Sequence, residues 1–166
     1  MLYKSIVGAL SVLLWMLVFL PGLTISSAPY RQQLISGHLS WTSVIMTLIT
    51  YTVTNVAVLC CLSGIIGAST RAIIGSTSKG EKTSEGEGMS GMLLAGVLRS
   101  FLIYLLFISG VYMATNAPFA APTQEQYVRV AGLISLFAFI SGYDPRFFAR
   151  IVDSFASATS QPRAKS

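Results

Sequence analysis

The chain has 166 residues, of which 53% are hydrophobic and only 10% are charged, and its mean hydropathy is +0.68. Soluble domains carry about 25% charged residues, so these values exclude an ordinary soluble domain and indicate a polytopic membrane protein. The net charge of +5 comes from basic residues spread over several segments, which do not make the single basic face that nucleic-acid binding requires.

The first hydrophobic segment extends from residue 5 to residue 25 and contains no charged side chain. A bilayer core of about 30 Å needs about 20 apolar residues in a helix, so this segment is predicted to span the membrane. It also resembles a secretory signal, because Lys4 precedes it and the small residues Ser26 and Ala28 follow it. Pro29 disfavours cleavage after Ala28, so we expect the segment to be retained as a signal anchor.

The second predicted span, residues 41–68, is the most informative segment because small residues recur along it in alternating steps of four and three. These residues are Ser43, Thr47, Thr50, Thr54, Ala57, Cys61, Gly64 and Ala68. In lipid, small side chains let helix backbones approach each other and hydroxyls form hydrogen bonds between helices. Asn55, an amide near the middle of the span, needs a polar partner or water. The small residues are interpreted either as a helix-packing face or as the lining of a water path or inter-subunit seam.

The third predicted span, residues 92–114, carries Arg99 inside an otherwise uncharged stretch and includes the small residues Gly96 and Ser100. An arginine at the bilayer centre costs about 2.5 to 3.5 kcal/mol on insertion scales, so Arg99 should lie near the cytoplasmic boundary. We expect it either to form an ion pair with Asp144 or to extend toward lipid phosphates.

The fourth predicted span, residues 126–143, repeats the small-residue spacing over a shorter distance. Its small residues are Ala131, Ser135, Ala138 and Gly142. Thr123 and Gln126 fit a capping box, which predicts a helix start near residue 123. Arg129 is expected to reach the outer membrane interface. Spans two and four are therefore expected to be the inner helices of one bundle.

A last helix is predicted over residues 145–156, because Asp144 is a favourable N-cap and Pro145 a favourable first helical residue. Apolar side chains share one face of this helix and basic residues flank that face, a pattern typical of a helix in the cytoplasmic membrane interface. The residues assigned to the lipid interface are Arg129, Arg146, Phe147, Phe148, Arg150 and Phe155. Docking under the bundle or against a partner is the alternative, and residues 157–166 are expected to be disordered.

The positions of the basic residues predict the orientation of the chain. With a cytoplasmic N-terminus, Arg31 and Arg129 lie outside, and the other nine of the eleven Lys and Arg residues lie inside, as the positive-inside rule favours. Both termini are then cytoplasmic. The short loops suggest the inner membrane of a bacterium.

Residues for catalysis or metal binding are sparse. His38 is the only histidine, and the only cysteines, Cys60 and Cys61, are adjacent in one predicted helix, where they point to different faces. The serines of the spans have no base or acid at the same depth in the membrane. The sequence therefore predicts no enzyme, no metal site and no cofactor.

The predicted fold is an all-α integral membrane protein, a single domain with a four-transmembrane-helix bundle and a C-terminal cytoplasmic interfacial helix. Two functions are consistent with it. The first is a self-associating protein that forms an oligomeric pore or permeabilises the membrane, with the lipid bilayer and copies of itself as partners. The second is a non-conducting accessory or scaffold subunit of a larger membrane complex. Nucleic acid is not an expected partner.

Overall fold

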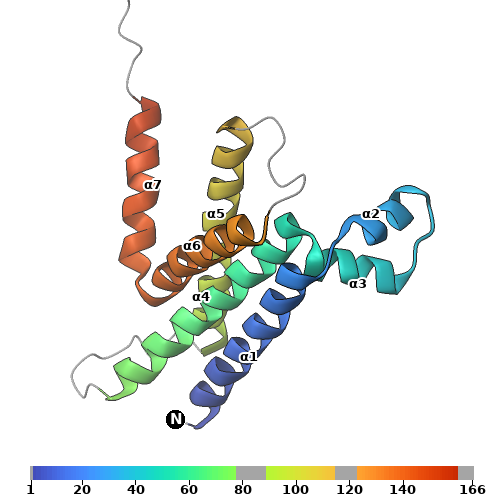
Figure 1. The fold of residues 1–166 in the computed structure, drawn as a ribbon. Helices are drawn as coiled ribbons and strands as arrows, with labels where there is room; N and C mark the ends of the chain where they lie inside the picture. The colour runs from blue at the N-terminus through green and yellow to red at the C-terminus, as the bar shows by residue number, and fades with distance from the viewer. Residues whose placement is uncertain (1, 78–88, 115–122, 161–166) are drawn as a thin grey trace, which may run out of the picture.

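The computed structural model describes residues 2–77, 89–114 and 123–160, and all regular secondary structure in these residues is helical (Figure 1). The helices are α1 (Leu2–Thr24), α2 (Ala28–Ile35), α3 (Trp41–Thr50), α4 (Thr52–Thr77), α5 (Met89–Ala114), α6 (Gln124–Tyr143) and α7 (Pro145–Ser160). For the described residues, the predicted all-α class is confirmed.

Three of the described helices contain segments long and apolar enough to cross a membrane. These segments are Tyr3–Thr24 in α1, Thr52–Gly75 in α4 and Ser90–Gly110 in α5. A helix of about 20 apolar residues matches the hydrocarbon thickness of a bilayer, so the chain belongs to the class of membrane-associated proteins. Helix α6 is not among the three, because Glu125 and Arg129 fall in its first turns.

Helix α4 is the central element of the fold. It packs against α1, α5 and α6, and Figure 1 shows α1, α4 and α6 side by side with α5 crossing behind α4. We call α1, α4, α5 and α6 the core helices. The buried apolar side chains between them are Val56, Leu59, Cys60, Tyr104, Tyr127, Ala131, Ile134 and Ala138, and α1 adds Trp15, Val18, Phe19 and Leu23 at the edge of this cluster.

The prediction of one continuous helix over residues 41–68 is wrong, because the chain leaves the helical conformation at Tyr51. The φ and ψ angles of this residue are −75° and 122°, so α3 ends before it and α4 begins after it. Threonine hydroxyls next to the break bond to the backbone: Thr50 Oγ1 donates to the Met46 carbonyl at 2.6 Å, and Thr54 Oγ1 to the Tyr51 carbonyl at 3.1 Å. Threonine combines low helix propensity with such local alternatives, which accounts for a break in this threonine-rich stretch.

Helices α2 and α3 form a hairpin beyond the ends of α1 and α4 (Figure 1). Gly37, with a φ angle of +82°, allows the turn between them, since this region of backbone space favours glycine. The Ser43 hydroxyl of α3 donates a hydrogen bond to the Gln33 side chain of α2. The Arg31 guanidinium of α2 lies over the Tyr51 ring, 4.5 Å from its centroid. This contact joins α2 to the residue at which the chain passes from α3 to α4.

The capping box predicted at the start of α6 is confirmed. Thr123 Oγ1 accepts a hydrogen bond from the Gln126 amide at 3.3 Å, and Gln126 Oε1 accepts one from the Thr123 amide at 3.1 Å. These two bonds satisfy amide groups that have no partner inside the helix. They fix the beginning of α6 one residue after Thr123.

The helix restart predicted at Asp144 and Pro145 is also confirmed. The α6 helix stops before Asp144, whose Oδ1 accepts a hydrogen bond from the Arg146 amide at 3.0 Å, and α7 begins at Pro145. Helix α7 continues to Ser160, so the predicted end of this helix at residue 156 is wrong. Residues 157–160, expected to be disordered, are helical; the remainder of the predicted tail lies outside the described residues.

Candidate functional site

A polar junction, formed by Asn55, Tyr127 and three backbone carbonyls, lies where α1, α3, α4 and α6 meet. Asn55 is fully buried, with 0% of its surface exposed. Its Nδ2 donates to the Val18 carbonyl of α1 at 2.8 Å and also to the Ile49 carbonyl of α3. Tyr127 Oη of α6 donates to Asn55 Oδ1 at 2.6 Å, and the Phe19 carbonyl lies 3.2 Å from the same hydroxyl.

The polar junction satisfies a side chain that would otherwise be costly at this depth. An unpaired amide in an apolar environment costs several kcal/mol, and here both the nitrogen and the oxygen of the Asn55 amide have partners. The partner that the sequence required for Asn55 is therefore supplied by other helices. Tyr127, to which no sequence pattern drew attention, is the residue that completes the junction.

A glycine seam, formed by Gly64 of α4, Gly96 of α5 and Gly142 of α6, brings three backbones into contact. A Cβ atom added to Gly142 would lie 2.3 Å from the Gly64 carbonyl oxygen, and one added to Gly64 would lie 2.6 Å from the Gly96 carbonyl oxygen. Both distances are shorter than any ordinary carbon–oxygen contact. Only glycine therefore permits this approach of the helices.

Polar side chains connect α5 to its neighbours beside the glycine seam. Ser100 Oγ donates to the Ala138 carbonyl of α6 at 3.1 Å, and Cys60 Sγ of α4 donates to the Ser100 carbonyl at 2.9 Å. Farther along α5, Tyr104 Oη donates to the Val53 carbonyl at 2.8 Å. Interhelical bonds of this kind each contribute about 0.6 to 2 kcal/mol in a membrane, so they reinforce the packing at the seam.

The eight small residues predicted as one stripe are divided between two helices. Ser43, Thr50, Gly64 and Ala68 are buried, whereas Thr47, Thr54, Ala57 and Cys61 are half-buried. The break at Tyr51 places Ser43, Thr47 and Thr50 on α3 and the other five residues on α4. On α4, Cys60 lies fully inside the core, whereas Cys61 is half-buried.

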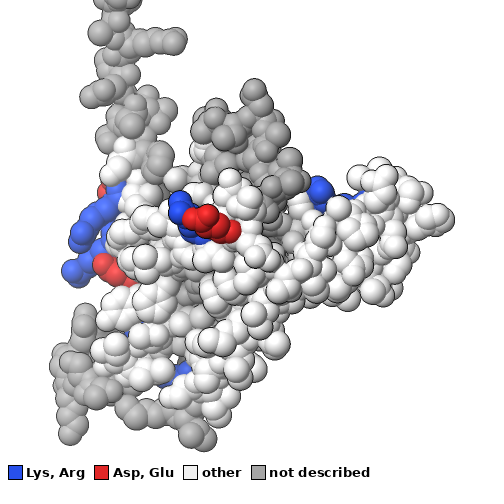
Figure 2. Space-filling view, viewed as in Figure 1, with Lys and Arg blue, Asp and Glu red and all other residues white. Residues whose placement is uncertain are grey.

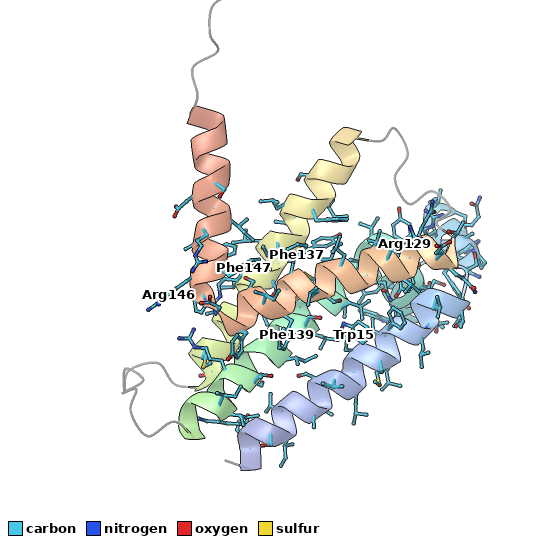
Figure 3. The ribbon with its side chains drawn as sticks, turned by 60° about the vertical axis from the view of Figure 1, so that its left-hand side comes forward. Trp15, Arg129, Phe137, Phe139, Arg146 and Phe147 are labelled. Atoms are coloured by element: carbon cyan, nitrogen blue, oxygen red, sulfur yellow. The ribbon has the colours of Figure 1, made fainter. Side chains whose placement is uncertain are left out.

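The shorter pattern in α6 lies on one buried face. Ala131, Ser135, Ala138 and Gly142 are all buried. This face meets α1 as well as α4 and α5, since Ser135 Oγ accepts a hydrogen bond of 3.2 Å from Trp15 Nε1. Figure 3 shows Trp15 on α1 directed toward α6. The small side chains of α6 are thus used for contacts within the chain.

The ion pair between Arg99 and Asp144 stays a prediction. Within the described residues, Arg129 forms an ion pair with Glu125, one turn apart on α6, and both side chains are exposed. Asp144 Oδ1 accepts the Arg146 amide at the start of α7, as a residue that caps a helix start does. Figure 2 shows red and blue atoms together over the first turns of α6.

The residues assigned to the lipid interface lie mostly at the start of α7. Phe147 and Phe148 are half-buried, while Arg146 and Arg150 are exposed. The Phe147 ring stacks on Phe137 of α6 with centroids 6.2 Å apart, and Arg146 points away from the core helices (Figure 3). The Phe155 side chain lies outside those that the structure describes. The first turn of α7 therefore packs against α6 through aromatic rings while its basic side chains face outward.

A polar cavity of about 290 Å³ opens next to the polar junction. It is lined by residues 22–28, by Arg31, by residues 50–52 and by Gln124 and Tyr127. Within the described ranges, no group of three or more His, Cys, Asp or Glu side chains has the arrangement of a metal site. The cavity is a place where polar side chains of the described residues surround open space.

No family model, no curated protein and no solved structure matches this chain.

Proposed function

We propose that this protein is a non-catalytic, non-conducting scaffold subunit of a larger membrane complex. The observation that carries the proposal is the glycine seam. The small-residue faces of α4, α5 and α6, which were the surfaces best suited to association between copies, are occupied within a single chain. When the small-residue faces are occupied by contacts within one chain, the large apolar side chains on the outside are available to contact lipid or other membrane subunits.

The surface offered to such partners is apolar and continuous along α5. Its exposed large side chains are Leu94, Leu98, Phe101, Leu102, Leu105 and Leu106. Their spacing of three and four residues places them on one helical face. Within a membrane this face suits lipid chains or another hydrophobic helix, and neither contact requires a polar group.

The proposal includes a topology with four membrane spans. Helix α6 is the fourth, and the Arg129–Glu125 pair at its first turn reduces the charge at the outer boundary. Helix α7 leaves α6 at a steep angle (Figures 1 and 3), which suits a helix along the cytoplasmic surface. Both termini are then cytoplasmic, and a bacterial inner membrane is the proposed location.

The oligomeric pore, the first of the two functions predicted from the sequence, is here the second proposal because it has less support. Its lining would require hydroxyls directed toward water, whereas Thr50 and Thr54 donate to the carbonyls of Met46 and Tyr51. Copies would also have to associate through large apolar side chains. The two proposals differ in the mass of the assembly and in conductance.

The deciding experiment measures the mass of the purified protein in detergent by light scattering, its conductance in planar bilayers, and its migration on native gels of the source membrane. For a scaffold subunit we expect a monomer or small oligomer without conductance in detergent and a larger complex in the native membrane. A ring of copies whose conductance falls on Thr50→Leu or Thr54→Leu would instead establish the pore. Migration as a monomer in the native membrane would contradict the scaffold role.

A further inference from the structure

The polar cavity has the size and the chemistry of a small ligand site. Its volume of about 290 Å³ is near the lower limit for pockets that bind small molecules, roughly 300 Å³. Among the lining residues that the structure describes, Arg31 is the only charged side chain, and the remainder include serine, threonine and tyrosine hydroxyls. A cavity with one cation, several hydroxyls and no carboxylate attracts an anion.

Arg31 is held over the Tyr51 ring and forms no ion pair with a described carboxylate. Its guanidinium carbon lies 4.5 Å from the centre of the Tyr51 ring, an arrangement that leaves the edges of the planar group open. Its Nε atom is buried and has no hydrogen-bond partner among the described residues. Glu125, which follows the cavity residue Gln124, is paired with Arg129, so this carboxylate does not neutralise Arg31.

Two hydroxyls of the cavity can donate to the same anion. Ser27 precedes α2, and its side chain makes no capping hydrogen bond to that helix. Ser26 Oγ accepts a long bond of 3.4 Å from the Ala28 amide, so its proton remains available. Arginine offers a planar pair of donors that matches two oxygens of one group, and the hydroxyls add further donors.

We propose that the polar cavity binds a phosphate group through Arg31, Ser26 and Ser27. The membrane-length segment of α1 ends at Thr24 and that of α4 begins at Thr52, and both residues line the cavity. The site therefore lies at the end of the apolar segments, where lipid phosphates are found in a bilayer. The group belongs either to an anionic phospholipid or to free phosphate. This inference goes beyond the proposed function and does not depend on whether the protein serves a larger complex.

The test is calorimetric titration of the full chain in detergent with three probes: phosphatidylglycerol, diacylglycerol of the same chain length, and inorganic phosphate. We expect phosphatidylglycerol or inorganic phosphate to bind and diacylglycerol not to bind. Binding of phosphatidylglycerol alone identifies a lipid source, and binding of inorganic phosphate identifies a soluble one. Arg31→Gln should weaken the binding by about tenfold or more, since charge-assisted hydrogen bonds contribute about 1.5 to 3 kcal/mol.

Two further variants make the test decisive. Ser27→Asp keeps Arg31 and supplies a favoured N-cap residue, but its carboxylate competes for the site, so it should weaken phosphate binding without loss of helicity. Arg146→Gln is the matched control, because it removes one exposed positive charge that points away from the core helices, and it should leave binding unchanged. Equal weakening by Arg31→Gln and Arg146→Gln, equal affinity for diacylglycerol, or no binding of either phosphate probe would overturn the proposal.

Discussion

Tyr127 and Asn55, separated by 72 residues in the chain, are joined by a hydrogen bond of 2.6 Å from the tyrosine hydroxyl to the amide oxygen. The same amide donates to the Val18 carbonyl at 2.8 Å. One buried side chain on α4 thus connects α6 to α1. Because neither partner can shift along its helix without breaking a buried bond, the polar junction sets the relative depth of these helices.

Removal of the Tyr127 hydroxyl should destabilise the fold. Tyr127→Phe keeps the ring but leaves the buried Asn55 Oδ1 without its donor, and an unsatisfied buried acceptor costs about 1 to 3 kcal/mol. We expect the free energy of unfolding in detergent to fall by this amount in denaturant titration. The control is Tyr143→Phe, which removes a hydroxyl from the exposed Tyr143 and should change stability by less than about 0.5 kcal/mol. Equal effects of the two changes would contradict the importance of the junction.

The glycine seam predicts opposite outcomes for two glycines of α6. Gly142→Ala places a Cβ atom 2.3 Å from the Gly64 carbonyl oxygen, so the helices must separate, and we expect a loss of about 1 to 3 kcal/mol. Gly132→Ala meets nothing within 4 Å and should be neutral or stabilise the helix by up to about 1 kcal/mol. Thermal unfolding in detergent measures both, and a Gly142→Ala protein as stable as Gly132→Ala would refute the close approach.

The two cysteines should differ in their reaction with a small thiol reagent. Cys60 is fully buried and its thiol donates a hydrogen bond to the Ser100 carbonyl, whereas Cys61 is half-buried. In the Cys60→Ser variant we expect rapid modification of Cys61, and in the Cys61→Ser variant a rate for Cys60 lower by about tenfold or more, because its reaction needs local opening. The comparison is made in detergent by mass spectrometry of timed samples. Denaturant should equalise the rates, and equal rates in the native protein would show that the register of α4 differs.

The proposed topology predicts the location of two connecting segments. Alkaline phosphatase fused after Pro118 should be active, because this enzyme requires export, whereas the same fusion after Gly80 should be inactive. A cytoplasmic fluorescent reporter at the two positions serves as the control and should give the reverse pattern. Active phosphatase at Gly80 would place the loop between α4 and α5 outside and would invert the orientation derived from the basic residues.

Elements with local signals were predictable from the sequence. The capping box of Thr123 and Gln126 and the restart at Asp144 and Pro145 depend on residues at most three positions apart, and the structure reproduces both. A contact between two helices depends on residues that meet at a particular depth, and no local pattern contains that information. Tyr127 escaped notice for the same reason, since its role is defined by Asn55 on another helix.

The sequence by itself determined the membrane class, the helical content and the places where α6 and α7 begin, because hydropathy and capping act over short distances along the chain. Tertiary structure alone decided which face of α4 is buried. Helix α4 packs against α1, α5 and α6, so that Asn55 and Cys60 are fully buried while Cys61 is only half-buried. Tertiary structure also decided that Gly64, Gly96 and Gly142 meet one another inside a single chain. A small residue in the sequence permits a close contact but does not specify its partner.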